Sequence, residues 1–227
     1  MKTTAVIVAG GSGQRMGTAI PKQFLPLHGK PVLWHTVKSF LDALDDMQVI
    51  VVLPEPYMQE GAAICSGFPD PHRIRITAGG DTRFDSVKAG LQLVQNPSVI
   101  LVHDAVRCLV TPGLIQRCCR QAIEKGSAVP AVAATDSIRI LENGSYVPAN
   151  REQVRIIQTP QTFVSEWLLH AFEQPYHPSF TDEATVVEAA GKKIHLIEGE
   201  HENIKITRPV DLLIAESVLG NRGVSLS

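Results

Sequence analysis

The sequence predicts an α/β fold of the Rossmann-like type, in which helices flank a mostly parallel sheet. Short runs rich in β-branched residues alternate with amphipathic stretches, which is the pattern of βα units. Most of these runs are apolar at nearly every position, as expected for strands that helices cover on both faces. A hairpin signal late in the chain adds an inserted β-hairpin arm to this fold.

The expected elements follow one another without a low-complexity linker, and 227 residues suit a single domain over residues 1–227. The β-branched runs predict strands at residues 3–9, 48–53, 73–77, 98–103 and 127–134. Apolar residues at helical spacing predict helices at residues 31–44, 85–94 and 111–126. After the hairpin signal we expect helices at 164–173 and 182–190, a strand at 193–199 and a closing helix from about Pro209.

The segment from 136 to 163 departs from the βα pattern, because apolar and polar residues alternate in it around Asn143-Gly144. This dipeptide is the strongest short hairpin signal in the chain. We therefore expect a β-arm insertion at about 136–160. A lone two-stranded arm is only marginally stable in water, so a second subunit is its natural packing partner, and the segment predicts a homodimer.

Charge and composition exclude several classes of protein. The chain has 21 Lys and Arg against 23 Asp and Glu, so it has no general basic field for holding nucleic acid. The N-terminal run TTAVIVAGG is too short for a signal peptide or a membrane span, which predicts a cytoplasmic protein with no membrane partner. The four cysteines of the chain show no CxxC spacing and are expected to be free thiols in a reducing compartment.

The first expected strand ends in a glycine-rich stretch, VAGGSGQRMGTAIPKQ, at residues 8–23. The spacing excludes both the GxGxxG dinucleotide fingerprint and the GxxxxGK[ST] phosphate loop. Pro21 and Pro26 disfavour a long helix here, so no helix N-terminus would face the phosphates. We expect Arg15 and Lys22 to supply positive charge to a triphosphate instead. The alternative is a surface turn with incidental charges.

Two later strand ends carry polar residues. In AGGDTRFDSV (78–87), Gly79, Gly80 and Asp81 follow a strand, so the turn would meet the base and ribose of a nucleotide; the alternative is a simple βα turn. In LVHDAVR (101–107), Asp104 ends an apolar strand, at the edge where open α/β sheets bind ligands. Asp104 is a natural Mg²⁺ ligand there, or else it caps the following turn. For His103 we favour a structural hydrogen bond.

A family resemblance joins these stretches. GGSGQRMG followed by PKQ resembles the signature of the sugar nucleotidyltransferases, and PKQFLPLHGKPVL resembles the branch that couples polyol phosphates to CTP. TDEA (181–184) and NIKITRPVDL (203–212) narrow the resemblance to the 2-C-methyl-D-erythritol 4-phosphate cytidylyltransferases. The resemblance covers almost the whole chain. It implies a homodimeric nucleotidyltransferase that joins methylerythritol phosphate to CTP with Mg²⁺, releasing pyrophosphate.

The resemblance also implies roles for single residues. The catalytic set is Arg15, Lys22, Arg151 and Lys205. The nucleotide-binding set is Ala9, Gly10, Gly11, Ser12, Gly13, Gly80, Asp81, Ser86 and Ala105. The substrate-binding set is Asp104, Arg107, Ser137, Arg151 and Thr159, with Asp104 also holding the metal. Without the resemblance, Lys205 between Ile204 and Ile206 reads equally as the outward face of an edge strand.

Two alternatives stay open at this point. Ribitol 5-phosphate cytidylyltransferases share GGxGxRM and PKQFLPL, and this chain departs from many methylerythritol enzymes by carrying Ser137 where they have threonine. The hydroxyl survives, so a phosphate contact at Ser137 is still possible. The other alternative is a non-catalytic nucleotide-binding protein on the same fold.

Overall fold

The computed structural model describes residues 1–10 and 20–224. An eight-stranded sheet forms the centre of this described part of the chain. The strand order is β10-β7-β11-β6-β1-β4-β5, and β12 pairs with β7. The strands are β1 (Lys2–Val8), β4 (Gln48–Leu53), β5 (Ile74–Ala78), β6 (Ser98–Asp104), β7 (Ser127–Ala133), β10 (Arg155–Ile157), β11 (Gln161–Val164) and β12 (Leu196–Glu198). Neighbours among β6, β1, β4 and β5 are parallel, which confirms the predicted sheet type.

Helices cover both faces of this sheet. Side chains alternate along β1, so that Ala5 and Ile7 join one buried cluster while Val6 and Val8 join the other. The first cluster contains residues of α1 (Val32–Ala43), α2 (Met58–Ser66) and α4 (Pro112–Lys125). The second contains residues of α3 (Arg83–Leu91), α5 (Ser165–Ala171) and α6 (Glu183–Ala189). The near-continuous apolar strands of the sequence are therefore explained by burial on both faces.

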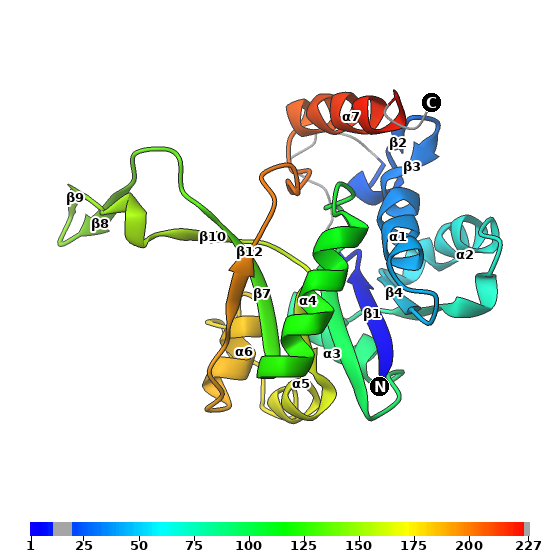
Figure 1. Cartoon of the computed structure of the whole chain (residues 1–227), viewed down its shortest axis with the longest axis horizontal. Coiled ribbons are helices and arrows are strands. Elements are labelled where there is room, and N and C mark those ends of the chain that lie inside the picture. The colour runs from blue at the N-terminus through cyan, green and yellow to red at the C-terminus, as the bar shows by residue number, and fades with distance from the viewer. Residues whose placement is uncertain (11–19, 225–227) are drawn as a thin grey trace.

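The closing helix α7 (Pro209–Val224) lies across the end of the molecule toward which β1 points (Figure 1). It packs through Ala215 on a third cluster that includes Leu27 and Leu109. Leu27 belongs to β2 (Pro26–Leu27), which pairs with β3 (Lys30–Pro31) in a small two-stranded sheet. Helix α2 and this small sheet are elements that the sequence did not predict.

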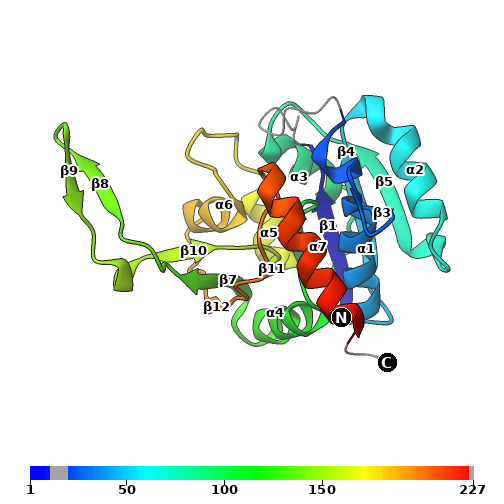
Figure 2. The same ribbon diagram turned by 90° about the horizontal axis from the view of Figure 1, so that it is seen from above.

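The strands β8 (Arg139–Glu142) and β9 (Ser145–Pro148) form a hairpin that projects from the body in both views (Figures 1 and 2). Asn143 and Gly144 have φ angles of 49° and 82°, as a tight two-residue turn of type I′ requires. This confirms the hairpin signal. The end of the alternating segment joins the main sheet instead, because β10 pairs with β7 and β11 lies antiparallel between β6 and β7.

All four cysteines are free and buried, as expected from their spacing. Burial raises the pKa of Cys108 and Cys118 to about 12, so these thiols stay protonated at neutral pH. Within the described ranges, no helix is both long and apolar enough to cross a bilayer.

Candidate active site

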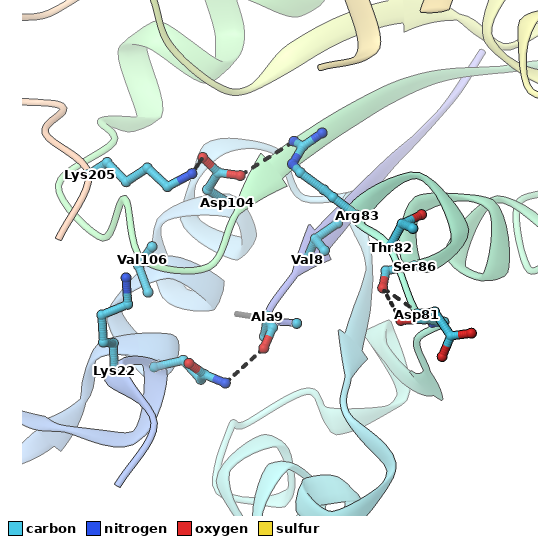
Figure 3. A pocket seen from close by; sticks show the side chains of 13 residues that line it. Val8, Ala9, Lys22, Asp81, Thr82, Arg83, Ser86, Asp104, Val106 and Lys205 are labelled. Atoms are coloured by element: carbon cyan, nitrogen blue, oxygen red, sulfur yellow. Dashed lines mark hydrogen bonds and ion pairs between the residues drawn. The ribbon is translucent and has the colours of Figure 1, made fainter. Parts of the chain in front are cut away.

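A cavity of about 230 Å³ lies where β1, β5 and β6 end (Figure 3). Parallel strands end at the same edge of a sheet, so residues far apart in the sequence meet there. The predicted nucleotide contacts that line this cavity are Ala9, Gly10, Gly80, Asp81 and Ser86. Lys22, Asp104 and Lys205 line it as well. The polar stretches that the sequence placed at separate strand ends therefore share one cavity.

The end of β1 is held by hydrogen bonds that also position Lys22. The Ala9 amide donates to the Val52 carbonyl at 2.8 Å, and the Gln23 side-chain amide donates to the Ala9 carbonyl at 2.7 Å. Gln23 and Lys22 belong to one short 3₁₀ turn, Lys22–Phe24. This bond therefore fixes the backbone that carries Lys22 beside the end of β1. In Figure 3 the Lys22 amine points toward Val106, across the cavity from Arg83.

The turn between β5 and α3 needs glycine, because its backbone lies against Ser86 and Asp85. A Cβ atom on Gly79 would sit 2.6 Å from Ser86 Oγ, and one on Gly80 would sit 2.4 Å from Asp85 Cβ. The Gly80 amide donates to Ser86 Oγ at 3.2 Å. Thr82 and Asp85 cap the start of α3 through a reciprocal capping box. These contacts hold the turn in place and leave its backbone facing the cavity.

Asp104 is the electrostatic centre of the site. Its Oδ2 atom lies 2.9 Å from Lys205 Nζ and 3.5 Å from Arg107 Nε, and its Oδ1 atom lies 3.4 Å from Arg83 Nη2. Burial alone would raise the pKa of Asp104, but Arg83, Lys205 and Arg107 hold it well below its ordinary value. Asp104 is therefore ionised at neutral pH, and the cavity carries more positive than negative charge around it.

The backbone of Asp104 is held from behind by Thr159 and His103. Thr159 Oγ1 accepts a hydrogen bond from the Asp104 amide at 3.1 Å and lies 2.9 Å from His103 Nδ1. His103 Nε2 lies 3.2 Å from the Arg107 carbonyl. The tautomer that satisfies both contacts carries its proton on Nε2 and accepts the Thr159 proton on Nδ1. Burial lowers the pKa of His103 to about 3, so the ring is neutral, in agreement with the structural role we favoured.

Arg83 is a site residue that the sequence reasoning missed. It is the first residue of α3, lines the cavity, and contacts both Asp104 and the buried carboxylate of Glu183. Burial by itself would lower the pKa of Arg83, but the two carboxylates raise it above its ordinary value. One signal was available in the sequence, because Arg83 stands two positions after Asp81 in AGGDTRFDSV.

The structure does not bring every predicted residue to this cavity. Arg151 and Ser137 lie together at the base of the arm, where they line another cavity. Ala105 is fully buried, with its amide donating to the Val8 carbonyl. Arg107 and Thr159 contact Asp104 without lining the cavity. The remaining predicted residues, Arg15, Gly11, Ser12 and Gly13, lie outside the described residues.

Comparison with known proteins places this chain in a family. The family model for 2-C-methyl-D-erythritol 4-phosphate cytidylyltransferase matches residues 3–221. Proteins of that name from Bacteroides fragilis and Porphyromonas gingivalis are 43% and 42% identical to this chain; each comparison covers 96% of this chain and 100% and 98% of the respective relative. The crystal structure of the Thermus thermophilus enzyme has a TM-score of 0.75 at 31% identity, covering 96% of this chain and 98% of that one.

These matches run over nearly the whole chain, so they include every stretch that lines the cavity. The sequence matches and the structural match point to the same family. The chain therefore belongs to the 2-C-methyl-D-erythritol 4-phosphate cytidylyltransferase family.

Proposed function

We propose that the cavity at the ends of β1, β5 and β6 binds CTP and transfers its cytidylyl group to 2-C-methyl-D-erythritol 4-phosphate. The products are 4-diphosphocytidyl-2-C-methyl-D-erythritol and pyrophosphate, in isoprenoid precursor synthesis. The observation that carries the proposal is the convergence of Lys22, Asp104 and Lys205 beside the Gly80-Asp81 turn. This arrangement offers a nucleoside-binding turn on one side and countercharge for phosphates on the other.

The reaction requires little proton transfer. The attacking group is a phosphomonoester oxygen of the substrate, and with a second pKa of about 6 it is largely ionised at neutral pH. The difficulty is that one anion must approach another, so the protein supplies countercharge and alignment. We assign Lys22 and Arg15 to the triphosphate, where they stabilise charge on the departing pyrophosphate. Arg151 and Lys205 hold the incoming phosphate in line with the α-phosphorus.

Mg²⁺ fits this cavity as a partner of the nucleotide. The described residues include no group of three or more His, Cys, Asp or Glu side chains that could hold a metal by themselves. Mg²⁺ commonly binds through one or two carboxylates together with substrate phosphates and water, and Asp104 offers one ionised carboxylate at the cavity. We therefore propose Asp104 as the protein ligand of Mg²⁺ that enters with CTP. When bound, the ion neutralises charge on the phosphoryl oxygens.

We also propose that the chain works as a homodimer through the arm. Arg151 and Ser137 lie at the arm base rather than in the cavity with Asp104, so a second chain is needed to bring them to a reaction site. The arm carries exposed apolar side chains, Ile140, Leu141 and Tyr146, that another subunit would cover. Buried free thiols suit a reducing compartment, and we propose the cytoplasm as the location.

The test is pyrophosphate release by the purified protein with CTP and Mg²⁺. We expect release with methylerythritol phosphate, little release with ribitol 5-phosphate, and none when either substrate or Mg²⁺ is omitted. Formation of the diphosphocytidyl product in step with pyrophosphate separates transfer from simple hydrolysis of CTP. Release with ribitol 5-phosphate but not with methylerythritol phosphate would overturn the substrate assignment.

A further inference from the structure

Arg83 lies between two carboxylates that come from distant parts of the chain. Its guanidinium contacts Glu183 through two nitrogens, with Nη2 3.1 Å from Oε2 and Nη1 against Oε1. The same Nη2 atom lies 3.4 Å from Asp104 Oδ1. Two parallel contacts to one carboxylate fix the plane of a guanidinium, whereas the single longer contact to Asp104 does not. Glu183 therefore decides how Arg83 faces Asp104.

Glu183 is itself held firmly and has no place in the cavity. It is the first residue of α6 and is 1% exposed. The preceding Asp182 caps the helix, and its Oδ2 accepts a hydrogen bond from the Gln161 side chain at 2.8 Å. Gln161 in turn accepts one from the Ala184 amide at 2.7 Å. Gln161 belongs to β11, so the main sheet anchors the helix end that presents Glu183.

This anchoring has a consequence for Asp104. With its fork committed to Glu183, Arg83 reaches only Oδ1 of Asp104, and Oδ2 stays with Lys205 at 2.9 Å. Without the Glu183 charge, Asp104 becomes the nearest anion to Arg83, and the fork is free to turn onto both Asp104 oxygens. Arg83 would then compete with Lys205 for Asp104 and disturb the pair that faces the incoming phosphate.

We propose that Glu183 is a positioning residue, which acts through Arg83 to hold the Asp104 carboxylate in the orientation that the alditol phosphate requires. The inference rests on the proposed function of the cavity, but it concerns a residue outside that cavity. A purely structural ion pair between α6 and α3 is the competing explanation, and the two make different predictions.

Glu183→Gln tests the proposal because glutamine keeps the size of the side chain and removes its charge. We expect the KM for methylerythritol phosphate to rise about tenfold or more, as for other partners that orient a site carboxylate. The affinity for CTP, measured by calorimetry without Mg²⁺, should not fall, because loss of the Glu183 charge leaves the surroundings of the nucleotide more positive. General damage to the fold would weaken the binding of methylerythritol phosphate and of CTP together, and that result would overturn the proposal.

Thr185→Ala is the matched control. It removes the capping-box hydroxyl from the same end of α6 and leaves the charges around Arg83 unchanged. We expect its KM to stay within about twofold of the wild type, even where its melting temperature falls as far as that of Glu183→Gln. Equal KM values for the two variants would show that Glu183 is only structural.

Two further variants keep the test decisive. In an Arg83→Gln background, adding Glu183→Gln should change the KM by less than about twofold, because the charge then has no residue to act through. If Glu183→Gln alone does not fold, Glu183→Asp takes its place, because aspartate keeps the charge on a shorter side chain. We expect Glu183→Asp to raise the KM for methylerythritol phosphate by less than the roughly tenfold expected of Glu183→Gln. A wild-type KM in both Glu183→Asp and Arg83→Gln would overturn the proposal. If the wild-type protein releases no pyrophosphate, that result refutes the proposed function instead.

Discussion

Single residues in this site differ in whether their charge or their hydrogen bonds matter. Asp104 meets three cations, from Arg83, Arg107 and Lys205, and stays ionised because of them. His103 is neutral and contributes only hydrogen bonds, because burial lowers its pKa to about 3. Adjacent residues of one strand therefore have opposite electrostatic roles, set by what each side chain faces.

Lys22 is the residue on which the proposed chemistry depends most. We expect Lys22→Ala to lower kcat by at least about a hundredfold, roughly 2.7 kcal/mol of transition-state stabilisation, because its charge would offset that of the departing pyrophosphate. Pyrophosphate release under saturating substrates measures this. Lys38→Ala is the control, since Lys38 is exposed and pairs with Asp42 on α1. Near-normal turnover by Lys22→Ala would remove Lys22 from the mechanism.

Thr159 is expected to stabilise the site through its hydroxyl. In Thr159→Val the Asp104 amide and His103 Nδ1 both lose a buried partner, and each unsatisfied group costs about 1–3 kcal/mol. We therefore expect urea unfolding to show a loss of about 2 kcal/mol or more. Thr159→Ser keeps the hydroxyl and should lose much less. Equal stability of the valine and serine variants would contradict the hydrogen-bonding role.

At the scale of elements, α4 shows how local signals set both helix ends. Thr111 caps its start by accepting from the Leu114 amide, and Gly126 ends it with a φ of 87°. A Cβ atom at Gly126 would lie 2.4 to 2.7 Å from ring carbons of Trp167 on α5. The glycine is thus required twice, by the left-handed backbone and by the close approach of the indole.

Gly126→Ala is therefore expected to destabilise the protein by more than the backbone cost alone. A left-handed alanine costs about 1–2 kcal/mol, and displacement of the Trp167 ring adds to this. Gly191→Ala is the control, because Gly191 has a φ of 79° and open space at its Cβ position. Chemical unfolding of both variants isolates the contribution of Trp167. A Gly126→Ala loss no greater than that of Gly191→Ala would contradict the packing argument.

At the scale of the whole molecule, the arm bears on whether one chain or two build each reaction site. Its exposed apolar residues, and the place of Arg151 in the lining of another cavity, support our proposal that reaction sites are completed between chains. The claim can be tested by mixing Lys22→Ala and Arg151→Ala chains, each of which we expect to be inactive alone. After unfolding and refolding together, half of the dimers contain both variants, and each such dimer has one intact site.

We therefore expect the mixture to recover about a quarter of wild-type activity. Each variant unfolded and refolded alone is the control and should stay inactive. Absence of recovery, in a mixture that sedimentation shows to be dimeric, would mean that each site is built within one chain. A purely monomeric protein would contradict the proposed assembly itself.

Much of this protein could be predicted because its signals are local. The buried strands, the helix ends at Pro31 and Gly126 and the Asn143-Gly144 turn each depend on a few adjacent residues, and the structure confirms them. Strand β11 was missed, since its four residues resemble the end of the alternating arm segment. Its place between β6 and β7 depends on pairing with distant strands.

The sequence by itself determined the α/β fold, the family and the strand ends at which we propose the reaction, because glycine turns and strand-end carboxylates appear as short patterns. Only the tertiary structure decided which charges meet. Arg83 and Glu183 stand 100 positions apart, and Arg83 and Asp104 stand 21 apart. No periodicity in the chain records such pairs, since they exist only where the sheet brings separate elements to one edge.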